Sequence, residues 1–586
     1  MFKTIKVNSS NADECLESIN KAHFIGLDTE TTGLDVYGKD TLFVITISTG
    51  DGKVYYFDFR DYNKSANGKG KFEDGSVACK LQAMLLSRDG VVFIHNAKFD
   101  LAFLEKCGFL LSKSQVVWCT MSMARVDNNE TSLSNFSLAS QASKIGLSKD
   151  TALDDWMSAN NATSYLDVPS EILIPYAAKD ADVCLDIGIV QYQRMLTGKY
   201  SHASLYKQEC DLTRVLYAIE KLGVVLNIDY CNEAIAKGSS AIEKYKSQFK
   251  DMTGKDFLKS NKLFELVFAD IKDQWVYKDT GNTSFDKNVL EKLKHPVADI
   301  IRKISNAKSK LDFYNGFIRF VDDNNILHTS FNSHGARTGR FSSSKPNLQN
   351  LKRTDTKESY PVRRAIVPRP NKLFAMIDYK QMEYRLVLDQ CNSSLISKVL
   401  SGLDVHTAAA EVAGVSRDAA KTVNFLTIYG GGIKKLSNDL GISIEKAKSV
   451  QNSIFKANPQ MRTYLQKNKR QAESERALRN CMGRYYDFSN TSSHVATNTL
   501  IQGGCADIIK KAMVDIHKFL TGKKTRMVLT IHDEIVFEFP RSEKDVIEEC
   551  AKLMQCAYKH TYLPLDVDIE WSDKSLADKK PWSELA

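Results

Sequence analysis

Acidic side chains near the start of the chain recur at spacings that could bring them together. Asp28 and Glu30 stand two residues apart at the end of the apolar run FIGLDTE, so both side chains leave the same face of an extended strand. Asp100 opens a helical segment after another apolar run, and Tyr176 and Asp180 lie four apart on one predicted helix face. Acids pointing into one site repel one another unless cations compensate them. A pair of divalent metals about 3.5–4 Å apart is the usual solution, and such pairs catalyse in-line attack on phosphate. Taken singly, each acid has an ordinary interpretation as a solvated or helix-capping residue.

A second set of acids lies in the second half of the chain. Asp378 comes at the end of the apolar run LFAMIDY, and His532, Asp533 and Glu534 separate the two apolar halves of MVLTIHDEIVFEF. The second pattern predicts a β-hairpin with acids at its turn. An acid at a strand end and another at a neighbouring turn could hold a further metal pair. The alternative is an ordinary polar turn.

A stripe of cations and aromatic residues lies between these acids. Arg417, Lys421, Phe425 and Tyr429 recur every four residues in RDAAKTVNFLTIYGGG, so they follow one face of a predicted helix over about 18 Å, at about 1.5 Å per residue. Such a stripe suits a nucleoside triphosphate, because cations meet phosphates and aromatic rings meet the sugar and base. The alternative is a helix with its aromatic end in the core and its basic end in water.

The elements that position these residues divide the chain into two α/β parts with a helical part between them. The first 190 or so residues alternate apolar runs of strand length (FIGLDTE, TLFVITIS, KVYYFDF and VVFIH) with helical segments, and residues 63–75 read as a polar loop. Residues 200–310 contain long charged helices, and a loop-rich segment, SFNSHGARTGRFSSSKPNLQNLKR, opens the last part. We find no internal repeat.

The composition is that of a large globular protein. The 586 residues carry 80 Lys+Arg and 71 Asp+Glu, a formal net charge of +9, which is only a weak indication of a polyanionic partner. No apolar run approaches about 18 residues, so no membrane span is predicted. The 12 cysteines form no C-x-x-C pair, and no targeting segment is recognised, so we expect a reduced protein of the bacterial or phage-infected host cytoplasm.

The first set of acids, in the order D-x-E, N-x-x-x-D and Y-x-x-x-D, resembles the DEDDy family of 3′–5′ exonucleases. The resemblance implies that Asp28, Glu30, Asp100 and Asp180 hold two Mg²⁺ ions and that Tyr176 orients the attacking water. Asn96 matches the polar residue of that family before Asp100. Its simpler role would be to cap the helix.

The second set of acids and the stripe resemble motifs A, B and C of the family A, Klenow-type DNA polymerases. The resemblance implies that Asp378 and Asp533 are catalytic, each binding metal, with two Mg²⁺ ions in the site and Mn²⁺ as a substitute. It also implies a dNTP site, with Lys421 as a candidate proton donor to pyrophosphate. The residues implied for that site are Gln381, Glu383, His406, Arg417, Lys421, Phe425 and Tyr429.

Further segments resemble those with which this family holds primer and template. ARTGRFSSSKPNLQN and NTLIQGGCADIIKKAM would supply residues that read minor-groove acceptors common to all correct pairs. The DNA-binding residues implied are Arg340, Asn347, Gln349, Asn498, Gln502 and His532, with Lys352 and Arg353 on phosphates. Two departures limit the transfer: Leu426 follows Phe425 where relatives have a smaller residue, and His494 replaces a DNA-contacting Arg.

The resemblance predicts a multidomain α/β fold, an RNase H-like α/β exonuclease domain followed by a right-hand polymerase with an antiparallel palm sheet and helical thumb and fingers. We expect the exonuclease at 1–190, palm entry and thumb at 191–330, palm at 331–390, fingers at 391–485 and palm again at 486–586. No 5′-nuclease domain is expected, and in this respect the chain resembles phage polymerases. Expected partners are primer-template DNA and dNTPs, and a processivity factor, helicase or single-strand-binding protein in DNA replication.

Two other functions fit parts of the pattern. A single-subunit RNA polymerase shares the A, B and C layout, but Glu383 in DYKQMEYR would fill the space that a ribose 2′-OH needs. An exonuclease with a C-terminal nucleic-acid-binding module would keep Asp378, Lys421 and Asp533 only by chance. A motor is excluded, because no Gly-Lys-Ser/Thr sequence occurs.

Overall fold

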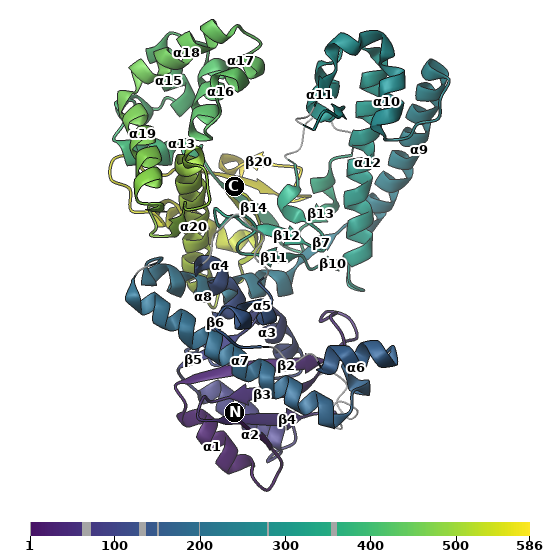
Figure 1. Cartoon of the computed structure of the whole chain (residues 1–586), viewed down its shortest axis with the longest axis vertical. Helices are drawn as coiled ribbons and strands as arrows, with labels where there is room; N and C mark the ends of the chain where they lie inside the picture. Colours follow the sequence, from purple (N-terminus) through teal and green to yellow (C-terminus); the bar gives the residue numbers. More distant parts are fainter. Residues whose placement is uncertain are drawn as a thin grey trace. The chain divides into compact units, whose positions relative to one another are not determined.

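The computed structural model describes residues 2–60, 72–127, 136–148, 152–198, 200–277, 280–352 and 360–585 (Figure 1). The chain forms two compact units from separated segments. Unit 1 comprises Met1–Leu222, Phe331–Ser342 and Ala375–Ile569, and unit 2 comprises Gly223–Ser330, Ser343–Phe374 and Glu570–Ala586. No helix among the described residues combines the length and apolar character needed to cross a membrane. The loop predicted at 63–75 lies outside the described residues up to position 71.

The N-terminal part of unit 1 is built on a mixed six-stranded sheet in the order β1-β4-β3-β2-β5-β6. Its strands are β1 (Lys3–Lys6), β2 (Phe24–Thr31), β3 (Leu42–Ser48), β4 (Lys53–Asp58), β5 (Val91–Ile94) and β6 (Val116–Cys119). β2 pairs antiparallel with β3 and parallel with β5, so it is central. The apolar runs predicted as strands form β2, β3, β4 and β5, which confirms that prediction. Every residue of β3 is buried, as expected for a strand covered on both faces.

Helices cover both faces of this sheet. They are α1 (Ala12–Lys21), α2 (Val77–Ser87), α3 (Ala97–Lys106), α4 (Thr120–Asp127), α5 (Leu138–Ser143), α6 (Ala152–Asn160), α7 (Ser170–Thr197) and α8 (Ala203–Leu222). Alternate side chains of β5 enter different cores: Val92 and Ile94 pack with α1, α2 and α3, whereas Val91 and Phe93 pack with α4, α7 and α8. Residues of α8 thus share a core with the sheet, although α8 follows residue 190, where the first domain is predicted to end. That domain limit stays a prediction.

The C-terminal part of unit 1 contains a second sheet. Its strands follow the order β17-β18-β14-β19, with β14 (Leu373–Tyr379), β17 (Arg526–Ile531), β18 (Glu534–Phe539) and β19 (Val567–Ser572). β17 and β18 form an antiparallel hairpin in which Ile531 faces Glu534, so the predicted hairpin is confirmed. The long helix α20 (Ala496–Phe519) and α21 (Lys544–Cys556) complete this part.

A group of helices follows β14. They are α13 (Met382–Cys391), α14 (Ile396–Leu400), α15 (Val405–Ala413), α16 (Arg417–Ile428), α17 (Ile433–Leu440), α18 (Ile444–Ala457) and α19 (Pro459–Ser474). Their ends are set by local chemistry: Ser416 Oγ accepts the backbone N–H of Ala419 at the start of α16, and Gly414 ends α15 in the left-handed region. A short hairpin of β15 (Ala477–Arg479) and β16 (Tyr485–Asp487) leads into α20.

Unit 2 is dominated by two long helices, α9 (Ile228–Thr253) and α12 (Pro296–Phe320), which lie side by side (Figure 1). They come close at Gly238, where a Cβ atom would lie 2.9 Å from Leu311 Cδ2. An aromatic core around Phe249, Phe264 and Phe268 joins them to α10 (Asn261–Val267) and α11 (Lys287–Lys292). A three-stranded sheet of β7 (Val224–Leu226), β10 (Ile326–Leu327) and β13 (Ile366–Val367) lies at their base, and β20 (Lys580–Pro581) pairs with the end of β19.

β2 and α7 approach each other closely at Gly26. A Cβ atom at this position would lie 2.2 Å from the carbonyl oxygen of Ala181. We expect Gly26→Ala to destabilise the protein by about 2 kcal/mol or more, because backbone must move to accept the methyl group. Thermal unfolding followed by circular dichroism measures the effect.

The matched control for this substitution is Gly432→Ala. Gly432 has a φ of −75° and open space where its Cβ would be, so its unfolding midpoint should change little. Equal midpoints for the two variants would contradict the close approach of β2 and α7.

Candidate active sites

The acids predicted near the N-terminus are brought together on β2, α3 and α7. Glu30, Asp100 and Asp180 are only 3–5% exposed, and Asp28 is half-buried. The close approach at Gly26 places α7 directly on β2, the strand that carries Asp28 and Glu30. The predicted convergence of these elements is therefore present in unit 1.

Burial controls the charge of Asp100. Removal from water raises the pKa of its carboxyl group to about 7, although the hydroxyl of Thr29 donates a hydrogen bond of 2.7 Å to Asp100 Oδ1. The same site raises the pKa of Tyr176, first through burial and then through the charges of Asp180 and Glu30. Tyr176 is 4% exposed and its ring packs edge-on against Tyr165. Its hydroxyl is therefore a neutral group close to the carboxylates.

The donor set suits a hard divalent cation. Carboxylate oxygens are the ligands that Mg²⁺ and Mn²⁺ prefer, and several buried carboxylates need positive charge to remain ionised together. Among the described residues, no group of three or more His, Cys, Asp or Glu side chains is already arranged as a ligand shell.

Two neighbours of this site differ from the expectation or were missed. Asn96 stands at the N-cap position of α3 with φ of 59°, but its side chain makes no capping hydrogen bond, so the capping role is wrong. Leu34 was missed: it lies in the loop that follows β2, four residues after Glu30, and it is 76% exposed. Only its position next to D-x-E could have drawn attention to it.

The two acids of the C-terminal part lie on adjoining ends of strands. The backbone N–H of Tyr379, directly after Asp378, donates to the carbonyl oxygen of Asp533 over 3.3 Å. His532 adopts a φ of 57° in the two-residue turn, and its side chain is exposed. The structure therefore joins the residues that carry the two carboxylates, Asp378 and Asp533, which lie far apart in sequence.

The predicted stripe forms the accessible face of α16. Arg417 and Lys421 are exposed, Phe425 is half-buried and Tyr429 is 36% exposed. The opposite face, with Ala420, Val423, Asn424, Leu426 and Ile428, is buried. The rings of Phe425 and Tyr429 stack with centroids 5.8 Å apart. The alternative with the aromatic end buried in the core is wrong.

His406 lies beneath this stripe, and Asp404 organises it. Asp404 caps α15 by accepting the N–H groups of His406 and Thr407, and it pairs with Arg417 at 3.1 Å. Although burial opposes it, hydrogen bonds from Thr407 and Arg417 hold the pKa of Asp404 well below its usual range. Burial lowers the pKa of His406 to about 4, so its imidazole is neutral at pH 7. Asp404 was missed, although an Asp directly before an apolar helical run is an N-cap signal.

The end of the stripe is bonded to three other elements. The Tyr429 hydroxyl donates to Glu383 on α13, and Arg340 from the 331–342 segment donates to the second oxygen of that carboxylate. Burial and the bond to Glu383 raise the pKa of Tyr429, and a hydrogen bond with Gln502 of α20 opposes that rise. Arg340, Glu383, Tyr429 and Gln502, predicted separately, thus form one connected group.

α20 presents Asn498 and Gln502 on its accessible side. Both are half-buried, whereas the residues between them are buried. At Gly503 a Cβ atom would lie 2.9 Å from the carbonyl oxygen of Thr338, so this glycine allows the 331–342 segment to touch α20. His494 is one of the two departures noted in the sequence. Its backbone carbonyl oxygen lies 2.6 Å from where a Cβ atom on Gly430 would be. Leu426, the other departure, is buried against Gly431.

The remaining predicted residues have local structural roles. Gln381, in the left-handed region before α13, accepts the N–H of Val405 at 3.4 Å. In unit 2, Asn347 caps a short 3₁₀ turn and Gln349 is 4% exposed. Contact of these residues with nucleotide or DNA stays a prediction. Arg353 lies outside the described residues.

Comparison with known families decides the assignment. Residues 228–576 match the model of DNA polymerase family A, and residues 4–190 match that of a 3′–5′ exonuclease. The chain belongs to DNA polymerase family A. The order of an α/β exonuclease domain followed by a polymerase domain, predicted from the sequence, is confirmed.

Individual relatives agree with this family. DNA polymerase I of Borreliella burgdorferi is 27% identical and that of Chloroflexus aurantiacus 29%, each over 98% of this chain and 64% of the relative. The chain thus spans 64% of the length of these two family A relatives. The fold is similar to that of the POL domain of Pol1 from M. smegmatis, in a complex with DNA primer-template and dNTP, with a TM-score of 0.84, 21% identity, and coverage of 98% of this chain and 99% of that one.

The neutral His406 predicts how this polymerase-family chain responds to acid. Its folded-state pKa of about 4 lies below the value of 6.5 usual for an unfolded histidine, so the unfolded state gains a proton first as the pH falls. Stability contributed by His406 is therefore complete above pH 6.5 and is lost as the pH falls toward 4. We expect His406→Gln to lose less of its unfolding midpoint between pH 7.5 and 5.0 than the unmodified protein does.

The control is His560→Gln, which replaces an exposed histidine. An acid response of His406→Gln equal to that of both other proteins would show that His406 is not held neutral in the folded state.

Proposed function

We propose that this chain is a template-directed DNA polymerase that adds dNTPs to a primer 3′-OH and removes misincorporated nucleotides with a 3′–5′ exonuclease. The observation that carries the proposal is the hydrogen bond between the backbone of Tyr379 and Asp533, which joins the strand ends bearing Asp378 and Asp533. Two carboxylates at one such junction, beside an exposed helix stripe of cations and stacked rings, suit phosphoryl transfer from a nucleoside triphosphate.

In the polymerase site, Asp378 and Asp533 would hold two divalent cations, Mg²⁺ or in its place Mn²⁺, which activate the primer 3′-OH and neutralise the leaving pyrophosphate. Arg417 and Lys421 would bind the triphosphate from the exposed face of α16, and Lys421 would give a proton to pyrophosphate. His406, neutral and beneath them, can offer only a hydrogen bond to phosphate. Phe425 would pack on the sugar, and Tyr429 would stand at the templating position.

Recognition of the base pair would fall to side chains that need no sequence information. Asn498 and Gln502 on α20, with Arg340 across from them, can donate to minor-groove acceptors that all correct pairs present. A mismatch displaces those acceptors, so this reading is blind to sequence and sensitive to errors. Arg340 also donates to Glu383, which links this recognition to the end of the α16 stripe.

In the exonuclease site, Asp28, Glu30, Asp100 and Asp180 would hold two further divalent cations that activate water and stabilise the charge developing on the phosphate. Tyr176 keeps its proton, because burial and the neighbouring acids raise the pKa of its hydroxyl. It can therefore orient an attacking water by a hydrogen bond without acting as a base.

Primer-template DNA and dNTPs are the proposed partners, and the Pol1 domain of similar fold was determined with both. The relatives described above are bacterial DNA polymerases I, so the phage-like organisation stays a prediction. A role in DNA replication, a cytoplasmic location and partners such as a processivity factor, helicase or single-strand-binding protein also stay predictions from the sequence.

Separate removal of the two acid sets tests the two-site assignment. We expect Asp28→Ala with Glu30→Ala to abolish 3′–5′ degradation, by a factor of about 10³ or more, and to leave extension nearly intact. Asp533→Ala should do the converse. Primer extension and primer degradation, measured on one labelled primer-template, report both activities.

Each variant serves as the control for the other, because both proteins keep one intact site. Loss of primer extension in the protein that carries both Asp28→Ala and Glu30→Ala would contradict the assignment of two separate active sites.

Glu383 should determine the choice between deoxyribonucleotides and ribonucleotides. Its side chain is 14% exposed and is held between Tyr429 and Arg340, so it has a fixed place beside the nucleotide stripe. We expect Glu383→Ala to increase the ratio of rNTP to dNTP incorporation by about 10²-fold or more, since the space for a 2′-OH is opened. Competition between the two nucleotides in single-turnover extension measures the ratio.

Tyr429→Phe is the matched control. It removes the hydrogen bond to Glu383 but keeps the carboxylate, so the ratio should change far less. If the ratio of rNTP to dNTP incorporation is unchanged in Glu383→Ala, Glu383 does not exclude the ribose 2′-OH. The RNA polymerase alternative would then have to be considered again.

A further inference from the structure

The segment Phe331–Ser342, which carries Arg340, is held at its start by the N-terminal part of unit 1. This part contains the candidate exonuclease site and helices α1 to α8, and we call it the exonuclease part. Lys98 of α3 donates to the carbonyl oxygen of Phe331 and pairs with Glu220 of α8, and Glu220 accepts the backbone N–H of Phe331. Lys98 and Glu220 are largely buried, with side chains 16% and 10% exposed. The entry to this segment is therefore fixed by helices of the exonuclease part.

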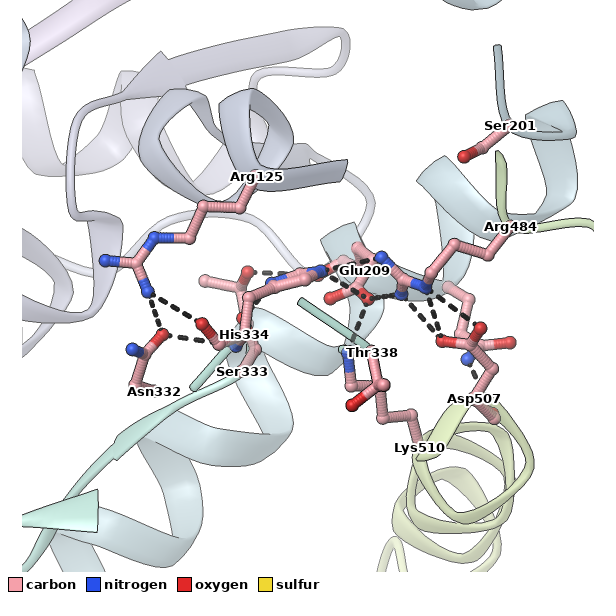
Figure 2. A network of polar contacts seen from close by, with 12 residues as sticks. Arg125, Ser201, Glu209, Asn332, Ser333, His334, Thr338, Arg484, Asp507 and Lys510 are labelled. Carbon is pink, nitrogen blue, oxygen red and sulfur yellow. Dashed lines mark hydrogen bonds and ion pairs between the residues drawn. The ribbon is translucent and has the colours of Figure 1, made fainter. Parts of the chain in front are cut away.

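Arg125 on α4 makes the next contact, shown on the left of Figure 2. Its Nη1 donates to Asn332 Oδ1 and, over 3.2 Å, to the carbonyl oxygen of His334. Asn332 Oδ1 in turn accepts the backbone N–H of His334 at 3.1 Å. One guanidinium thus fixes the turn of the segment from the exonuclease side.

A buried ionic cluster holds the middle of the segment (Figure 2). Arg484 bridges two acids: its Nη2 lies 2.6 Å from Glu209 Oε1 on α8 and 2.6 Å from Asp507 Oδ1 on α20. Lys510 Nζ lies 2.8 Å from the same Glu209 oxygen. These four side chains are at most 1% exposed. Two positive and two negative charges balance, so the cluster ties α8, α20 and the β15–β16 hairpin together without net charge.

His334 connects the segment to this cluster. Its Nε2 lies 2.9 Å from Nη1 of Arg484, which can only donate, so Nε2 accepts and the proton is on Nδ1, beside Ser333 Oγ at 2.9 Å. Burial lowers the pKa of His334 to about 4, in agreement with a neutral ring. Glu209 Oε1 stands 3.3 Å from the same Nε2.

The far half of the segment is set by the same arginine. Gly339 has a φ of 86°, and a Cβ atom there would lie 3.2 Å from Arg484 Nε, so the backbone rests on the guanidinium. The Gly335 N–H donates to the carbonyl oxygen of Arg340 over 2.7 Å, which closes the loop. The position of Arg340 therefore depends on contacts made at Asn332 and His334, six to eight residues earlier.

We propose that Arg125 is a positioning residue for DNA synthesis: from the exonuclease side it fixes the segment that places Arg340 at the primer terminus. The proposal rests on the proposed function of this chain as a proofreading polymerase. Loss of the Arg125 contact weakens the hold of the polymerase site on a matched primer end. The primer end then passes more often to the exonuclease, whose own carboxylates are untouched.

The test compares Arg125→Met, Asn332→Ala and the double variant in the full chain. Three quantities are measured: dNTPs incorporated per nucleotide excised on a matched primer-template, the KM for primer-template in extension, and the excision rate on single-stranded DNA. The matched control is Arg214→Met, because Arg214 also donates to backbone carbonyls in unit 1, those of Ser112 and Gln115, without touching the 331–342 segment.

We expect Arg125→Met to lower the ratio of incorporation to excision about tenfold or more, because the variant loses the charge-assisted hydrogen bonds to Asn332 and to the His334 carbonyl oxygen. The KM for primer-template should rise by a similar factor with kcat nearly unchanged, and single-strand excision should stay normal. Asn332→Ala should show the same change. The combined effect in the double variant should be clearly smaller than the product of the two single effects, because both variants remove the shared Arg125–Asn332 hydrogen bond. Arg125→Lys should recover part of the ratio.

Three results would overturn the inference: a ratio equal to that of Arg214→Met, additive effects in the double variant, or parallel loss of extension, single-strand excision and unfolding midpoint. Failure of the proposed function is distinguishable, because the unmodified protein would then not extend a primer at all.

Discussion

The guanidinium of Arg484 is the point on which the polymerase part of unit 1 depends. It pairs with Glu209 and Asp507, and the backbone at Gly339 lies against it. Removal of one partner from such a buried pair costs about 3–5 kcal/mol, because the other charge remains without compensation. The cluster therefore fixes the relative placement of α8, α20 and the segment with Arg340 more strictly than apolar packing alone would. The planar guanidinium donates in a rigid fork, so its pairs with two carboxylates specify direction as well as distance.

The exonuclease carboxylates show the opposite treatment of buried charge. Glu30, Asp100 and Asp180 are 3–5% exposed, and burial raises the pKa of Asp100 to about 7. In the Arg484 cluster, by contrast, although burial opposes it, His334, Lys510 and Arg484 hold the pKa of the buried Glu209 well below its usual range. One cluster is complete and stabilises the fold. The other leaves a demand for positive charge at the place where phosphate chemistry is proposed. Charge balance within the protein thus separates a structural site from a functional one.

Much of this organisation was predictable from the sequence. The strands, the β17–β18 hairpin, the exposed stripe of α16 and the convergence of both acid sets follow from local periodicity and from motifs with fixed spacing. The Arg484 cluster was not predictable, because Glu209, His334 and Asp507 carry no local signal and meet only through tertiary packing. His406 illustrates a related limit: its helix position was readable, but its burial and neutral state depend on Asp404, Tyr384 and Phe425 around it. The extent of the first compact unit was also hidden, since α8 looks like any charged helix.

The double role of α8 limits how far the chain is modular. One face of this helix, through Leu205, Tyr206 and Cys210, completes the apolar core around Phe93 and Trp118, while Glu209 enters the ionic cluster with Arg484. A cut at residue 190 would open that core and leave Arg484 short of an acid. An N-terminal part that keeps both this core and the ion pair therefore has to extend through α8 and to keep the acid at Glu209. Residue 190 lies inside α7, so a limit there would divide a helix as well as separate α8 from this core.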